Sequence, residues 1–261
     1  MPTPNTAVLT ERLPNHVTLV TINRPQARNA VNADVASGLE AAIDAAEADP
    51  DVWVVVLTGA GHDAFSAGAD LKAVSSGTAS GLRTERGGFG GFVHAQRSKP
   101  WIAAVNGPAL AGGCELALAC DLIVAVSTAR FGLPEVKRGL VASAGGLYRL
   151  PRALPQALAL EMILTGEPIS AERAYQCGMV NQCVAPGELL AAAQALAARI
   201  TVNAPVAVRQ SLRVARRALD CTDAELRDLS QQAQAAVYIS EDFKEGPLAF
   251  IEKRAPRWVG R

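Results

Sequence analysis

A glycine-rich turn between an apolar strand and a helix constrains this chain most. In residues 103–121, AAVNGPALAGGCELALACD, the strand ends at Val105 and the segment Asn106-Gly107-Pro108 breaks it. A helical pattern then begins at Cys114, directly after Gly112-Gly113. The first N–H groups of a helix lack internal acceptors, and the helix dipole adds about half a positive charge there. The turn therefore predicts a site for an anion or a developing oxyanion.

Glu115 is the one charged residue on the apolar turn that follows. It lies three residues after Gly112, within the first turn of the expected helix. A carboxylate in this place either caps the helix or acts as a catalytic acid or base. This stretch taken alone favours capping.

Two further stretches repeat the pattern of an apolar strand followed by a turn. The segment AFSAGADL, at 64–71, follows VWVVVLTG, and FGLPEVKRG, at 131–139, follows DLIVAV and brings in Glu135. In their order and spacing, the three stretches resemble the crotonase family, also called the enoyl-CoA hydratase/isomerase superfamily. The resemblance extends from INRPQARNAV near the start to EGPLAFIEKRAPRW near the end.

The local patterns agree with the α/β architecture of that family. Residues 7–12 and 17–22 predict a hairpin or meander, and residues 52–57 predict a buried parallel strand. Asn32 is the expected N-cap of the helix between residues 22 and 52. Four residues at helical spacing form its expected buried face, namely Val35, Leu39, Ile43 and Ala46. Further along, 155–164 and 170–177 predict helices, 179–184 a short strand, and the chain from 186 onward more helices.

The resemblance implies a particular form of this α/β fold. We expect a crotonase-type (ClpP/crotonase-like) spiral of repeated ββα units over residues 1–200, which carries the active site. Residues 201–261 are expected to form a C-terminal helical region that builds a homotrimer, or a hexamer as a dimer of trimers. Its apolar positions are Val206, Val208, Leu212, Val214, Leu219, Leu226, Leu229 and Val237. The alternative is that these helices fold back on their own core as a monomer.

The chemistry implied by the resemblance is the reversible addition of water to a 2-enoyl-CoA thioester. The backbone N–H groups of Ala69 and Gly112 are the expected oxyanion hole for the thioester oxygen. Glu115 and Glu135 are the expected catalytic carboxylates acting on one water, and the N–H of Gly139 is expected to help orient it. Two carboxylates can perform both proton transfers of a syn hydration if they hold different protonation states.

Coenzyme A enters this scheme as part of the substrate, so neither a separate cofactor nor a metal is expected. The resemblance places its binding on three segments, around NRPQARNAV, FSAGADLK and FIEKR. The residues carried over as CoA or substrate contacts are Ala27, Arg28, Ala30, Ala67, Asp70, Leu71, Lys72, Pro134, Phe250 and Lys253. For Arg28 and Lys253 a solvated surface charge is the competing interpretation.

The sequence pattern of one segment allows two interpretations. Residues 74–91, VSSGTASGLRTERGGFGG, are rich in Gly and Ser and carry Arg83, Glu85 and Arg86. They are interpreted either as a solvated loop or as a mobile lid over the acyl end of the substrate.

Composition limits the partners and the compartment. The formal net charge is zero, so nothing favours nucleic acid or an anionic membrane surface. No uninterrupted apolar stretch is long enough to span a membrane, and the N-terminus shows no secretory or mitochondrial targeting pattern. Five cysteines without a CxxC motif indicate reduced thiols, and hence a cytoplasmic location.

Other classes of protein fit less well. No GxGxxG opens a helix after the first strand, which argues against a nicotinamide dehydrogenase, and no GxSxG elbow or P-loop is present. A crotonase-like binding protein without activity is disfavoured because both glutamates are present. Within the family, a hydro-lyase of enoyl-CoA hydratase type in fatty-acid (β-oxidation) or related acyl-CoA metabolism is the first interpretation. The segment AGGLYRLPR differs from the common GAGGTQRL and favours a carnitinyl-CoA dehydratase branch as the alternative, with an enoyl-CoA isomerase as another.

Overall fold

A six-stranded sheet forms the centre of the protein in a computed structural model that describes residues 6–75 and 79–261. The strand order is β1-β2-β3-β6-β8-β11, and every neighbouring pair is parallel except the hairpin β1-β2. The strands are β1 (Val8–Leu13), β2 (Val17–Ile22), β3 (Val54–Gly59), β6 (Trp101–Val105), β8 (Leu122–Val126) and β11 (Gln182–Val184). The predicted hairpin is therefore confirmed, and β11 is shorter than the predicted strand 179–184.

A second, smaller sheet is formed by strands that lie along the chain between strands of the first sheet. It has the order β10-β9-β7 and consists of β7 (Ala109–Leu110), β9 (Arg130–Gly132) and β10 (Ile169–Ser170). Strand β6 leads into β7 and then into helix α3 (Gly112–Ala119), and β8 leads in the same way into β9. These two turns of the chain thus each add one strand to each sheet before a helical segment, as in the predicted ββα repeat.

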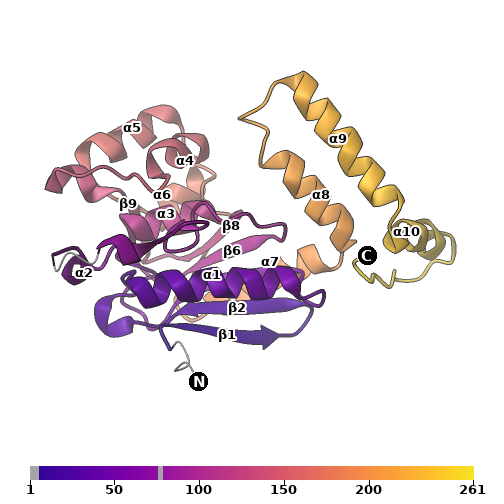
Figure 1. Cartoon of the computed structure of the whole chain (residues 1–261), viewed down its shortest axis with the longest axis horizontal. Helices are drawn as coiled ribbons and strands as arrows, with labels where there is room; N and C mark the ends of the chain where they lie inside the picture. The colour runs from indigo at the N-terminus through magenta and orange to yellow at the C-terminus, as the bar shows by residue number, and fades with distance from the viewer. Residues whose placement is uncertain (1–5, 76–78) are drawn as a thin grey trace.

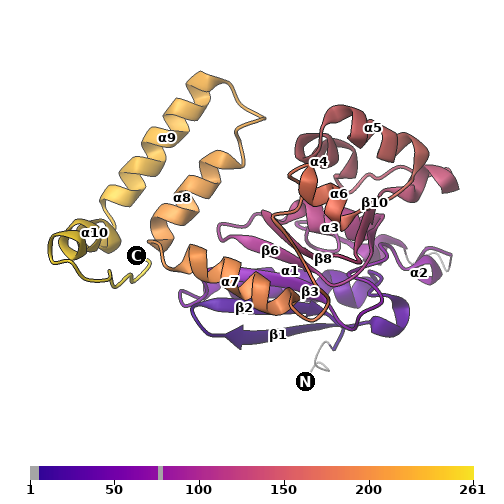
Figure 2. The same cartoon turned by 180° about the vertical axis from the view of Figure 1, so that it is seen from behind.

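Helices α1 (Ala33–Ala48) and α7 (Leu189–Thr201) cover opposite faces of the main sheet, as Figures 1 and 2 show from its two sides. The N-cap of α1 is Asn32, whose side chain accepts a hydrogen bond from the N–H of Val35. All four predicted core positions of α1 are buried. The apolar faces of both helices exclude water from the strands between them, and so the central strands are buried on both sides.

Helices α4 (Gly146–Ala153), α5 (Gln156–Thr165) and α6 (Ala171–Gln176) gather beside the second sheet, and α2 (Leu71–Ser75) lies apart from them (Figure 1). The helix expected to begin at Cys114 begins two residues earlier, since Gly112 and Gly113 have helical geometry. α5 is followed by its C-cap residue, Gly166, which has a φ of 66° and donates its N–H to the carbonyl of Met162.

The segment 74–91 is folded where the structure describes it, and residues 76–78 lie outside the described part. Residues Ala79–Leu82 form a 3-10 turn, followed by a ribbon of β4 (Arg83–Thr84) and β5 (Gly88–Phe89). Phe89 is buried, although Arg83 on the paired strand is exposed. This described part is therefore not a solvated loop, and its movement as a lid stays a prediction.

The last three helices form an arm that stands away from the sheets (Figures 1 and 2). They are α8 (Pro205–Ala215), α9 (Asp223–Tyr238), which starts with a capping box between Thr222 and Glu225, and α10 (Glu241–Ile251). The guanidinium of Arg216 ties the arm to the core through both carboxylate oxygens of Asp121. The predicted boundary at residue 200 falls in the last turn of α7, and the division into two units stays a prediction.

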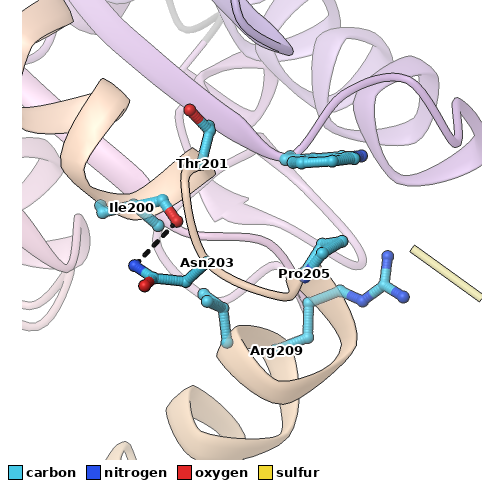
Figure 3. Close-up of a pocket in the computed structure, with 7 residues that line it drawn as sticks. Ile200, Thr201, Asn203, Pro205 and Arg209 are labelled. Atoms are coloured by element: carbon cyan, nitrogen blue, oxygen red, sulfur yellow. Dashed lines mark hydrogen bonds between the residues drawn. The ribbon is translucent and has the colours of Figure 1, made fainter. Parts of the chain in front are cut away.

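The turn between α7 and α8 encloses a small cavity (Figure 3). Asn203 donates a hydrogen bond to the carbonyl of Ile200 across this turn, and Thr201, Pro205 and Arg209 also line the space. Its volume of about 10 Å³ has room for roughly one water molecule. This cavity is thus part of the joint between core and arm and is too small for a substrate.

Candidate active site

The N-terminus of α3 is held in a fixed loop. Asn106 accepts a hydrogen bond from the N–H of Gly59 at the end of β3 and donates one to the carbonyl of Gly61. Ala111 has a φ of 51°, which turns the chain sharply before the helix starts at Gly112. Gly112 is the first residue of α3, and so its N–H has no intrahelical acceptor.

A second N–H, that of Ala69, lies beside this terminus. Val31 pairs with this segment by donating to the carbonyl of Gly68 and accepting from the N–H of Asp70. Successive N–H groups of an extended chain point in opposite directions, so the N–H of Ala69 points away from Val31. A Cβ at Gly68 would lie 2.8 Å from the nitrogen of Gly112, which shows how closely the two segments approach. Within the described residues, no hydrogen bond occupies either N–H. The geometry agrees with the predicted oxyanion pair, whose role stays a prediction.

The two glycines of α3 are also required by packing. A Cβ at Gly112 would come within 2.4 Å of Cε1 of Phe89, and one at Gly113 within 2.0 Å of the carbonyl oxygen of Ser66. Sequence reasoning did not single out Phe89, and its position between glycine pairs was the available signal. The aromatic ring covers the start of α3 from the β4-β5 ribbon and helps to keep water from it.

Glu115 does not cap its own helix. Its side chain is 3% exposed, and Oε1 accepts a hydrogen bond of 2.9 Å from the N–H of Gly146, the first residue of α4. Burial raises the pKa of Glu115, and the N–H groups of Gly146 and Ala144 oppose that rise because they stabilise the ionised form. The structure therefore favours the alternative to capping, in which Glu115 is a buried carboxylate that faces a site.

Glu135 lies in the 3-10 turn Pro134–Arg138, and its Oε2 is buried without a hydrogen-bond partner. The pKa of Glu135 is raised to about 7, chiefly by burial and further by the charge of Glu115, against a backbone hydrogen bond that lowers it. The two carboxyls lie in one region, because a Cβ on Gly146, whose N–H binds Glu115, would lie 2.8 Å from Cδ1 of Leu133, two residues before Glu135. Their environments differ, since one holds backbone N–H donors and the other has a free buried oxygen.

Gly139 ends this turn with a φ of 66°. Its N–H already donates within the turn, to the carbonyl of Val136 at 3.3 Å. A water-orienting role would have to share this N–H, and so that role stays a prediction.

Arg149 is a half-buried residue of the site that the sequence did not indicate. Its Nη1 donates to the carbonyl of Ala144 at 3.1 Å and its Nη2 to that of Val93 at 2.5 Å. The side chain passes so close to Gly145 that a Cβ there would lie 1.9 Å from Nη1. Arg149 therefore holds the loop that presents the N–H of Gly146 to Glu115.

Two of the three segments predicted to bind CoA, residues 23–31 and 65–72, lie side by side. Arg24 forms an ion pair of 2.9 Å with Asp70 and also donates to the carbonyl of Ala30 at 2.6 Å. The buried amide of Asn29 donates to the carbonyls of Ala60 and Ala64. Arg24 and Asn29 thus join residues 23–31 to the chain that leads into and includes residues 65–72, although the sequence analysis named neither residue.

The residues predicted to contact CoA in these two segments have different exposures. Ala30 is buried, whereas Leu71 is 62% exposed and Lys72 is exposed. Ala27 and Arg28 belong to the turn of residues 25–28, within the segment 23–31. The N–H of Ala67 donates to the carbonyl of Arg28. Because the carboxylate of Asp70 is committed to Arg24, we expect any contact of Asp70 with CoA to come from its backbone.

Phe250 and Lys253 are not brought to this site within one chain. Phe250 lies in α10 and Lys253 just after it, and in both views α10 is at the opposite end of the molecule from α2. Phe250 is 85% exposed. A role at a CoA site therefore requires a second copy of the chain.

Two features are absent from residues 6–75 and 79–261. They contain no group of three or more His, Cys, Asp or Glu side chains placed to hold a metal ion. No single helix in that part is long and apolar enough to cross a membrane, and the pair α7 and α8, which reaches this only together, is bent by 103°.

Comparisons with known proteins agree with this site and fold. The family model described as enoyl-CoA hydratase/isomerase matches residues 12–261. A carnitinyl-CoA dehydratase of Salmonella arizonae is 43% identical over 246 residues, which cover 92% of this chain and 94% of that protein. The chain belongs to the enoyl-CoA hydratase/isomerase family, which confirms the resemblance read from its motifs.

Solved structures support the same conclusion. The crystal structure of an enoyl-CoA hydratase from Mycobacterium tuberculosis matches with a TM-score of 0.93 at 47% identity, covering 98% of this chain and 99% of that one. A carnitinyl-CoA hydratase from Mycobacterium avium matches with a TM-score of 0.76 at 50% identity, over the same shares. The predicted crotonase fold with C-terminal helices is confirmed.

Proposed function

We propose that this protein is an enoyl-CoA hydratase, a hydro-lyase that adds water reversibly to the double bond of a 2-enoyl-CoA thioester. The observation that carries the proposal is the placement of two carboxyls, the buried Glu115 and the half-buried Glu135 with its buried Oε2, in one region with the N–H groups of Ala69 and Gly112, which no hydrogen bond occupies within the described residues. The enoyl-CoA hydratase name of the mycobacterial structure supports it.

The two N–H groups bind the thioester oxygen in this mechanism. When water adds to the β-carbon, negative charge moves onto that oxygen and an enolate forms. Donors that are already fixed in place stabilise such charge without reorganising, and removal of one donor typically costs about 10²–10³ in rate. Glycine at 112 leaves the approach to its N–H open on the side that Phe89 does not occupy.

The two carboxyls have different tasks because their environments differ. Glu115 holds backbone N–H donors that favour its ionised form, and we assign to it the proton that water loses as the C–O bond forms. Glu135 has a pKa of about 7 and a buried oxygen without a donor, and we assign to it the proton delivered to the α-carbon. The proton gained by Glu115 returns to Glu135 after the product leaves. Two groups on one side of the double bond give syn addition.

A carnitinyl-CoA dehydratase is the second candidate, and it would use the same residues. It is supported by relatives of that name that are 41–43% identical to this chain over more than 90% of its length. An enoyl-CoA isomerase is a third candidate, and it is disfavoured because an isomerase has no need for two carboxyls that share a water.

The substrate panel decides among these candidates. Purified protein is incubated with enoyl-CoA thioesters of increasing chain length and with the trimethylammonium-bearing enoyl thioester, and loss of the conjugated enoyl absorbance is followed. Formation of 3-hydroxyacyl-CoA supports hydration. A shift of the double bond without uptake of water, or no turnover of any enoyl thioester, overturns the proposal.

The assembly and setting belong to the same proposal. We infer a homotrimer, or a hexamer made of two trimers, that acts on acyl-CoA thioesters in the cytoplasm, in fatty-acid β-oxidation or related metabolism. The arm supports the assembly, since it leaves Leu219, Ile239 and Phe250 at least 70% exposed in one chain. Of its eight predicted apolar positions, Val206 is the buried one in a single chain.

A further inference from the structure

The β4-β5 ribbon covers the reacting end of the candidate site. Arg83 and Phe89 are directly paired across the ribbon. The ring of Phe89 lies where a Cβ on Gly112 would be, at the start of α3. Arg83 is therefore carried on the element that closes over the oxyanion position.

The guanidinium of Arg83 reaches the other side of the same site. Its Nη2 donates to the hydroxyl of Ser143 at 3.2 Å, three residues before Gly146, whose N–H binds Glu115. The charge of Arg83 lowers the pKa of Glu115, which places it within electrostatic range of that carboxyl. Arg83 thus links the ribbon that carries Phe89 to the loop before α4. We expect the acyl group beyond the double bond to lie beside it.

This charge has no carboxylate partner. In the part of the chain that the structure describes, no Asp or Glu oxygen lies within 4.0 Å of Arg83. Its neutral partner, Ser143, is exposed and easily displaced. The second arginine of the region, Arg149, differs because two backbone carbonyls already hold it. Arg83 is therefore free to receive an anionic group.

The neighbouring aromatic ring offers nothing to a cation. Quaternary ammonium groups are recognised by open aromatic faces. The ring of Tyr148, at the start of α4, already has the guanidinium of Arg149 at 5.1 Å and that of Arg152 at 5.8 Å from its centroid. A trimethylammonium group here would meet the positive charges of Arg83 and Arg149 and an occupied ring, whereas the charge of Arg152 is paired with Asp220.

We propose that Arg83 selects the acyl group, so that the enzyme prefers enoyl-CoA thioesters whose acyl chain ends in a carboxylate over those that end in a trimethylammonium group. The inference rests on the proposed hydratase function. An arginine binds a carboxylate through two parallel hydrogen bonds, which are about twice as strong as neutral ones. A cationic acyl group would instead be repelled at the same place.

The test uses three enoyl-CoA thioesters of equal chain length, ending in a methyl, a carboxylate or a trimethylammonium group. Hydration is followed by the loss of enoyl absorbance, and the readout is the ratio of kcat/KM between substrates, so effects on the shared chemistry cancel. We expect the carboxylate substrate to exceed the trimethylammonium substrate at least tenfold. Arg83→Gln should remove that excess, and Arg83→Glu should reverse the preference.

Arg86→Gln is the matched control. Arg86 lies three residues further along the same ribbon, but its guanidinium pairs with Asp44 on α1. We expect the wild-type ratios in this variant. Ratios that are unchanged in Arg83→Gln and Arg83→Glu, or a wild-type preference for the trimethylammonium substrate, overturn the inference while leaving hydration intact. Absence of turnover with all three substrates overturns the proposed function itself.

Discussion

The carboxylate of Glu115, in α3, is bound at 2.9 Å by the backbone N–H of Gly146, the first residue of α4. Two helix starts therefore meet at this site. In the proposed mechanism, one supplies the N–H of Gly112 to the substrate oxygen, and the other holds the carboxylate of Glu115, which acts on water. Arg149 fixes the second start through the carbonyl of Ala144. The catalytic geometry thus depends on how α3 packs against α4.

Replacing either glutamate should remove one proton transfer. We expect Glu115→Gln and Glu135→Gln each to lower kcat by about 10²–10⁴, the usual contribution of a positioned acid or base. The double variant should lose much less than the product of the two effects, because both groups act on one water. Steady-state hydration rates check this, with circular dichroism as the control for folding. Near-normal turnover in either folded variant contradicts the hydratase assignment.

The rate of hydration should fall as pH rises through the pKa of Glu135. The pKa is raised to about 7, and we assign to Glu135 the proton that the α-carbon receives. Above that pH the carboxyl is ionised and kcat/KM should fall about tenfold per pH unit. The profile is measured from pH 5.5 to 9 with an unsubstituted enoyl-CoA. A profile that stays flat between pH 6 and 9 would refute the assignment of the acid.

The same group should make stability depend on pH. Its pKa rises from 4.5 when unfolded to about 7 when folded, so between these values the folded state binds more protons than the unfolded state. The free energy of unfolding therefore falls with rising pH in this window. Glu135→Gln stays neutral, and its stability relative to wild type should increase from pH 5 to pH 8 in urea titrations. A constant difference would show that the carboxyl is not buried as described.

Removing the N–H of Gly112 should abolish most activity, but a simple substitution would also clash with Phe89. We therefore compare Gly112→Pro/Phe89→Leu with Gly112→Ala/Phe89→Leu. In both variants the smaller leucine replaces the aromatic ring. Proline is tolerated at the first position of a helix, and so the pair differs chiefly in the donor.

The proline variant should be about 10²–10³ slower than the alanine variant. Thermal unfolding of both checks that they are folded to the same extent. Equal rates in the two folded variants would place the oxyanion donor elsewhere.

The arm should assemble copies of the chain. Burial of apolar surface contributes roughly 25 cal/mol per Å², and helices α9 and α10 expose large apolar side chains in one chain. Light scattering should give the mass of a trimer or hexamer, and Ile239→Asp should lower it. A mass near the 27.2 kDa of one chain at all concentrations would contradict the assembly and any role for Phe250 at a neighbouring site.

The sequence by itself determined the elements and the order of the chemical groups. Asn32 caps α1, the β1-β2 hairpin pairs as expected, and the glycine pair at 112–113 starts α3. These features depend on local rules, namely capping, side-chain periodicity and the conformational freedom of glycine. The family could be read for the same reason, since its motifs are short local segments in a fixed order.

The tertiary structure decided which groups meet. That Phe89 covers Gly112, that Arg149 fixes the loop before Gly146, and that Arg83 reaches Ser143 all join segments far apart in the chain. No local pattern specifies such contacts, because they follow from how helices and ribbon pack on two sheets. Glu115 is the clearest case. Its position in the first turn of α3 favoured a cap, and only packing against α4 gave its carboxylate a distant N–H donor and a raised pKa.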